Sequence, residues 1–136
     1  RGYGDLLFAI DKPGLALEAY RRAIALSPPG QAWRVRNNLA RWFRMTGERA
    51  QEVVELRASL ASEPAQGDIR GYLVAALLAL GQYGDAASEA DSALARGGSA
   101  TIFAALRAVA DSAARVGAPP GSIRIGLVAG ESRPVR

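Results

Sequence analysis

The 136-residue chain contains no cysteine and no histidine. A disulfide, a thiolate nucleophile, an imidazole base and a zinc site of the usual ligand types are therefore excluded. No window of about 18 apolar residues occurs, so no segment has the character of a membrane-spanning helix. Absence of cysteine suits the cytosol and the periplasm alike, and we slightly favour the cytosol.

Lysine is nearly absent, because Lys12 is the single lysine beside 16 arginines. The net charge of +4 is unevenly spread. Residues 33–49 carry five arginines against one glutamate, whereas residues 67–120 are slightly acidic. A nucleic-acid partner would use these arginines on phosphates with Trp33 stacking on a base, and the modest charge disfavours it.

The length corresponds to one domain, and 49% hydrophobic with 22% charged residues is typical of a folded protein. The chain begins at Arg1 without a methionine, and we expect the first helix of the first repeat to be cut short. We therefore expect a piece of a longer bacterial protein or a processed form.

A repeat of about 34 residues organises the chain. Three segments place a small residue, an aromatic residue or leucine, a second small residue and a proline or glycine at shared offsets, with some departures. The three copies are Ala16, Tyr20, Ala23, Ile24 and Pro28; Glu52, Leu56, Ser59, Leu60 and Pro64; and Ala86, Ala90, Ala93, Leu94 and Gly98. This period is typical of stacked helical hairpins, which bury their apolar faces only by packing on one another.

Helix signals run through most of the chain. Asp11 is the expected N-cap of the first predicted helix, and Ser99 that of the last. Proline and glycine mark the ends between them. The predicted helices span about 13–26, 32–46, 50–61, 69–80, 85–96 and 100–116.

Residues 122–129 alternate and are rich in β-branched side chains, which predicts one strand. A lone strand is not stable in water, so we expect it to pair with a following domain or a partner. Deleting residues 118–136 should then leave helix content and melting nearly unchanged.

The chain resembles the tetratricopeptide repeat family. The residues that carry the resemblance are Gly4, Ala16, Tyr20, Ala23, Pro28, Leu39, Ala40, Phe43, Leu56, Pro64, Leu73, Leu77, Gly81, Tyr83, Ala86, Ala93 and Leu94. Departures are Glu52 for a small residue, Ala90 for an aromatic residue and Gly98 for proline. The resemblance implies an all-α, right-handed superhelical array of three helical hairpins with a closing helix and a short extended tail.

The expected domain spans residues 1–116, with repeats at about 1–30, 33–66 and 67–100 and the closing helix at 100–116. Residues 117–136 are the tail or the start of a following domain. Trp42 is expected to pack between helices, and Trp33 at a repeat boundary. Paired carboxylates such as Glu52 and Glu55 are expected to be solvated rather than catalytic.

The resemblance also implies that one face of the first helix in each hairpin lines a concave groove. In the second hairpin that face carries Arg34, Asn37, Asn38, Arg41 and Arg44, ending at Met45. Amides match a peptide backbone, and guanidinium groups favour carboxylates or phosphates. Tyr72 occupies the same face of the third hairpin and completes the candidate peptide-binding residues. The alternative is a solvated polar stripe.

Some family members clamp a C-terminal carboxylate with basic and amide side chains. Asn38 matches that pattern, but Asp68 would repel a carboxylate, so this clamp is not expected. The segment 123–128 is similar to the first strand after the repeats in bacterial relatives of O-linked N-acetylglucosamine transferases. In that case catalytic residues would lie beyond Arg136.

The sequence therefore predicts a non-enzymatic scaffold or adaptor that binds a protein or a peptide, including an acidic protein or peptide. The alternative is the substrate-positioning repeat arm of a larger enzyme, such as a glycosyltransferase, whose catalytic domain follows residue 136. No catalytic residue, metal ligand or cofactor is assigned within the chain. Its oligomeric state and its partner are left open.

Overall fold

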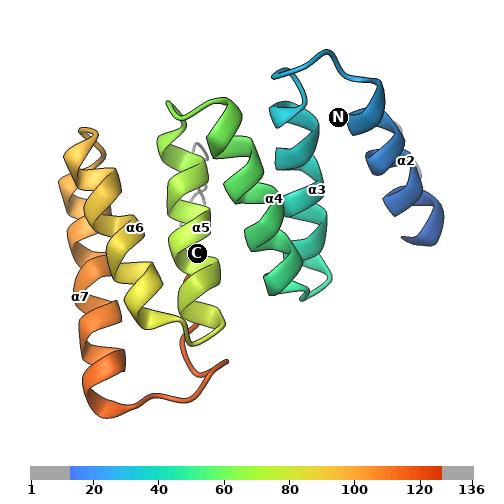
Figure 1. Ribbon diagram of the computed structural model, residues 1–136. Helices are drawn as coiled ribbons and strands as arrows, with labels where there is room; N and C mark the ends of the chain where they lie inside the picture. The colour runs from blue at the N-terminus through green and yellow to red at the C-terminus, as the bar shows by residue number, and fades with distance from the viewer. Residues whose placement is uncertain (1–12, 127–136) are drawn as a thin grey trace, which may run out of the picture. The chain divides into compact units, whose positions relative to one another are not determined.

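The computed structural model describes residues 13–126, which form six α-helices and no strand (Figure 1). The helices are α2 (Pro13–Leu26), α3 (Trp33–Met45), α4 (Arg49–Ser62), α5 (Gly67–Ala79), α6 (Tyr83–Ala95) and α7 (Ala100–Val116). Successive helices within each unit pack on one another, as in a helical repeat, and the all-α prediction is confirmed. The chain divides into two compact units, Arg1–Ala65 and Gln66–Arg136.

The six predicted helices all form, with ends that differ from expectation by up to two residues. The largest differences are the starts of α5 at Gly67 and of α6 at Tyr83, which the sequence placed in a turn. The Ser99 hydroxyl accepts a hydrogen bond from the backbone N–H of Ile102 at 3.3 Å, which confirms this N-cap. Asp11 lies outside the described residues.

In the first unit, α3 contacts both α2 and α4, and α3 and α4 lie side by side as a hairpin (Figure 1). Tyr20 of α2 and Trp42 and Phe43 of α3 form the aromatic part of the core. The ring centroids are 6.5 Å apart for Tyr20 and Trp42 and 5.4 Å apart for Trp42 and Phe43. These tilted arrangements suit aromatic pairs, and the prediction that Trp42 packs between helices is confirmed.

In the second unit, α5 packs against both α6 and α7, which also pack on each other. Most of α5 is buried, including every residue from Leu73 to Leu78. A helix that is apolar on all sides is stable in water only when neighbours cover it. The sequence Leu-Val-Ala-Ala-Leu-Leu therefore marks the centre of this unit.

Burial supports the phase of the repeat. The first small position holds Ala16, Glu52 and Ala86, and all three are fully buried. The next position holds Tyr20, Leu56 and Ala90, which are also buried. At the third position Ser59 and Ala93 are buried, whereas Ala23 is half-buried. The same turn of the second helix in each hairpin therefore faces the interior.

Ala93→Leu should lower the free energy of unfolding by about 1–3 kcal/mol, because a larger side chain overpacks a full interior. Ala93 is 1% exposed on α6. Ala95→Leu, at an exposed position of the same helix, is the matched control. Chemical denaturation measures both, and equal stability of the two variants would show that the Ala93 site has room to spare.

Four helices end in the same way. After α3, α5, α6 and α7, a glycine with positive φ follows the last turn, and the next backbone N–H donates to a carbonyl five residues earlier. This Schellman arrangement satisfies carbonyls that the helix leaves without partners. At Gly98 a Cβ would lie 2.9 Å from the Phe103 ring. This close approach explains why glycine replaces the proline of the other copies.

The segment after α7 differs from expectation. Residues 123–126 have no regular secondary structure, and the rest of the predicted strand, 127–129, lies outside the described residues. The Tyr83 hydroxyl donates to the Ala118 carbonyl at 2.9 Å, and the Gly121 N–H donates to the Ala79 carbonyl at 2.9 Å. The residues just before the predicted strand are therefore bonded to both α5 and α6.

A turn directs the chain back toward α5. Ser122 N–H donates to the Pro119 carbonyl at 3.2 Å, and Gly121 has a φ of 86°. Proline followed by a glycine of positive φ is typical of a type II turn. In Figure 1 the chain leaves the end of α7 and runs below α6 toward the end of α5.

Candidate functional site

The five candidate residues of α3 divide between two faces of the helix. Arg34 and Arg41 are exposed and Asn38 is half-buried, and they lie at spacings of four and three residues along one row. Met45 continues this row and is 59% exposed. We call Arg34, Asn38, Arg41 and Met45 the exposed row. It lies between the face of α3 that meets α2 and the face that meets α4.

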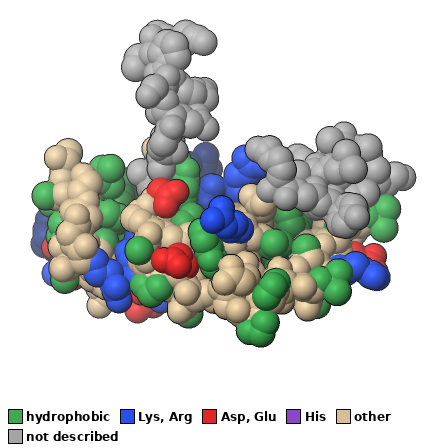
Figure 2. Space-filling view, turned by 90° about the horizontal axis from the view of Figure 1, so that it is seen from above, with side chains coloured by type: hydrophobic (Ala, Val, Ile, Leu, Met, Phe, Trp, Pro, Cys, Tyr) green, Lys and Arg blue, Asp and Glu red, His purple; other side chains and the backbone are tan. Residues whose placement is uncertain are grey.

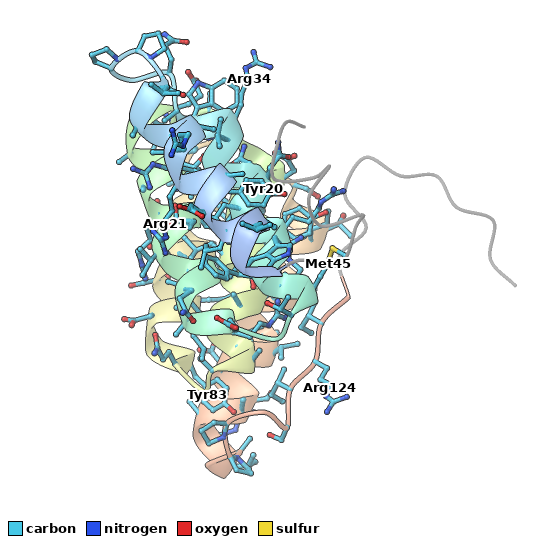
Figure 3. The ribbon with its side chains drawn as sticks, turned by 90° about the vertical axis from the view of Figure 1, so that its right-hand side faces the viewer. Tyr20, Arg21, Arg34, Met45, Tyr83 and Arg124 are labelled. Atoms are coloured by element: carbon cyan, nitrogen blue, oxygen red, sulfur yellow. The ribbon has the colours of Figure 1, made fainter. Side chains whose placement is uncertain are left out.

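Arg34 is held close to the helix surface by its neighbour. Its guanidinium carbon lies 4.6 Å from the centre of a Trp33 ring. A cation over an indole face is attracted by the ring electrons. The contact orients Arg34 at the start of the exposed row and leaves the residue open to solvent (Figure 3).

Asn37 and Arg44 belong to the face that meets α4. The hydroxyl of fully buried Ser59 donates to the Asn37 side-chain oxygen at 2.6 Å. The Arg44 Nε donates to a Glu52 carboxylate oxygen at 2.7 Å. Both side chains thus join α3 to α4, and the sequence pattern did not separate these two residues from the exposed row.

The carboxylates expected to be solvated are buried. Glu52 is fully buried and accepts hydrogen bonds from Arg44 and Arg49, each at 2.7 Å. Glu55 is 5% exposed and accepts from Arg36 at 2.8 Å. A buried carboxylate needs such partners because water no longer solvates its charge. The prediction of solvated glutamates is wrong because the arginines of the hairpin enclose them.

The Arg36–Glu55 pair has a counterpart in the next hairpin. Arg70 and Glu89 lie at the same spacing, 34 residues later in the chain. Arg70 is 7% exposed on α5, and burial lowers the pKa of its guanidinium. Repulsion from Arg96 lowers this pKa further, and attraction to Glu89 opposes both effects. The repeat therefore includes a polar pair that its apolar pattern does not reveal.

These ion pairs show which arginines of residues 33–49 are bound to carboxylates. Glu55 is paired with Arg36, and Glu52 is paired with Arg44 and Arg49. The two exposed arginines of α3, Arg34 and Arg41, both lie on its exposed row. A row of two guanidinium groups, one amide and one thioether can bind carboxylates and backbone amides, and it offers no nucleophile or general base.

Tyr72 is half-buried on α5 and belongs to the second unit. The exposed row of α3 belongs to the first unit. Among residues 13–126, no cluster of three or more acidic side chains could hold a metal ion. None of the helices in this part of the chain is long and apolar enough to cross a membrane.

Exposed hydrophobic side chains on the face seen in Figure 2 are scattered among polar and charged ones. No protein-family model, curated protein or solved structure gives a significant match to this chain.

Proposed function

We propose that this chain is a non-enzymatic protein-interaction module of the tetratricopeptide type, built as a right-handed superhelical array. Its exposed row on α3 binds an acidic peptide segment of a partner protein. The observation that carries the proposal is the exposure of Arg34 and Arg41 in one row of α3, whose Arg36 and Arg44 are paired with glutamates of α4. A peptide in this position would meet two solvent-exposed guanidinium groups.

The spacing of the row suits a short peptide. Arg34 and Arg41 are seven residues apart, which is about 10 Å along a helix. Two carboxylates of one short segment can span this distance. Asn38 lies between them and can both donate to and accept from a peptide backbone. Met45 adds a flexible apolar contact at the end of the row.

Arg41→Glu should weaken binding of an acidic peptide about three- to thirtyfold, because an attraction becomes a repulsion at an exposed site. Asn38→Ala should weaken it about two- to tenfold through loss of one hydrogen bond. Fluorescence anisotropy with labelled acidic, neutral and basic 15-residue peptides measures both effects. Added salt should weaken binding of the acidic peptide to the wild type.

Arg21→Glu is the matched control. Arg21 is an exposed arginine on α2 of the same unit, and it points away from Met45 (Figure 3). It carries the same charge change but lies off the exposed row. If Arg21→Glu and Arg41→Glu weaken the acidic peptide equally, net charge rather than the row determines binding, and the proposal fails.

A further inference from the structure

An open groove runs beside α7, away from the residues used above. One wall is the half of α7 from Ala108 to Val116, and the other is formed by Ala118 and Ile123. Its volume is about 370 Å³. This lies at the low end of the range of about 300–1,000 Å³ for ligand sites in proteins. The lining is almost entirely apolar, and Ser112 contributes its one side-chain hydroxyl.

The second wall is fixed before any ligand arrives. The Tyr83 hydroxyl donates a hydrogen bond to the Ala118 carbonyl, and the Ala79 carbonyl accepts one from the Gly121 N–H. Ile123 follows directly after this anchored turn and is half-buried. A ligand in the groove therefore does not have to order the segment first, which favours binding.

The α7 wall of the groove is open to water at its end. Val116 is 75% exposed, although it lies at the last position of α7. Covering an exposed valine side chain with another apolar group lowers the free energy, because apolar surface is removed from water. The groove is thus suited to a branched or aromatic side chain rather than to a polar one.

The rim of the groove is positively charged. The Arg115 Nη2 donates to the Ser112 hydroxyl at 3.2 Å, which places this guanidinium beside the lining. Arg124 follows Ile123 but points away from the helices (Figure 3), so Arg115 is the cation placed beside the lining. The nearby carboxylate of Asp111 shares the Arg107 guanidinium with Asp91, at 2.6 Å and 3.0 Å respectively. An occupant with a carboxylate next to its apolar side chain would therefore match both the apolar lining and Arg115.

We propose that this groove is a second binding site, which takes a leucine-rich acidic peptide of a partner protein. The leucines cover Val116 and Ile123, and a flanking carboxylate meets Arg115. The proposal is independent of the exposed row on α3, because the two sites share no residue.

The test uses a fluorescein-labelled dodecapeptide in which two adjacent leucines are flanked by aspartates. Val116→Asp should weaken its binding at least tenfold, and Arg115→Glu about fivefold. Val54→Asp is the matched control, because Val54 is an exposed valine on α4, outside the groove. Circular dichroism checks that each variant remains folded. A peptide with lysines for the aspartates should bind at least tenfold more weakly.

Equal binding by the wild type and Val116→Asp would overturn the proposal. A loss of dodecapeptide binding in Arg41→Glu, with Val116→Asp unchanged, would place this peptide on the α3 row instead. Sedimentation of the free protein tests the remaining occupant. A dimer that Val116→Asp dissociates would show that a second copy fills the groove, which also overturns the proposal.

Discussion

Glu52→Ala is expected to lower the free energy of unfolding by about 3 kcal/mol. Glu52 is fully buried and accepts hydrogen bonds from Arg44 and Arg49. Removing one partner of a buried ion pair costs about 3–5 kcal/mol, because the other charge loses its counterion. Both arginines are nearly a quarter exposed, at 24% and 22%, so water recovers part of this loss. The lower end of the range therefore applies.

The repeat pattern and the structure predict opposite effects of this substitution on stability. Alanine occupies the same position in the other two copies, as Ala16 and Ala86. The pattern alone thus predicts that Glu52→Ala is tolerated, and the ion pairs predict the opposite. Urea denaturation followed by circular dichroism decides between them. Glu18→Ala, at an exposed glutamate of α2, is the control and should change stability by less than about 0.5 kcal/mol.

A chain that ends at Gly117 should be less stable by about 2–3 kcal/mol than one that ends at Gly126. The shorter chain loses the hydrogen bonds from the Tyr83 hydroxyl and the Gly121 N–H, each worth about 0.5–1.5 kcal/mol. It also loses the apolar contact of Ile123 beside α7, worth up to about 1 kcal/mol for a half-buried side chain. Comparing these two chains isolates residues 118–126.

Thermal and urea denaturation of the two chains measure this difference. Tyr83→Phe in the longer chain removes only the hydroxyl and should cost about 1 kcal/mol. Equal stability of the two chains would support the initial expectation of a detached tail. It would also remove the fixed wall on which the groove beside α7 depends.

Much of the fold could be predicted because its signals are local. Proline and glycine mark the ends of helices, and apolar residues recur at helical spacing. The spacing of small residues gave the phase of the repeat, and the burial of Ala16, Ala86 and Ala93 agrees with it. Ser99 could be identified as an N-cap because its hydroxyl bonds to a residue only three positions later.

The sequence placed five of the candidate residues on one predicted helix, and the structure shows that helix as α3. It could not divide the candidates between two faces, since Asn37 and Asn38 are adjacent and chemically identical. The packing of α4 decides the matter by placing Ser59 against Asn37. A helix surface pattern shows which residues lie in a row, whereas a neighbouring helix determines which row remains exposed.

By itself, the sequence determined the helices, their ends to within two residues, the repeat phase and the absence of cysteine and histidine chemistry. Only the tertiary structure decided that Glu52 and Glu55 are buried and paired with arginines, and that the segment after α7 is bonded to α5 and α6. The physical reason is distance along the chain. Arg36 and Glu55 are 19 residues apart, and Tyr83 and Ala118 are 35 apart. Such contacts depend on how the helices pack, which local residue patterns do not encode.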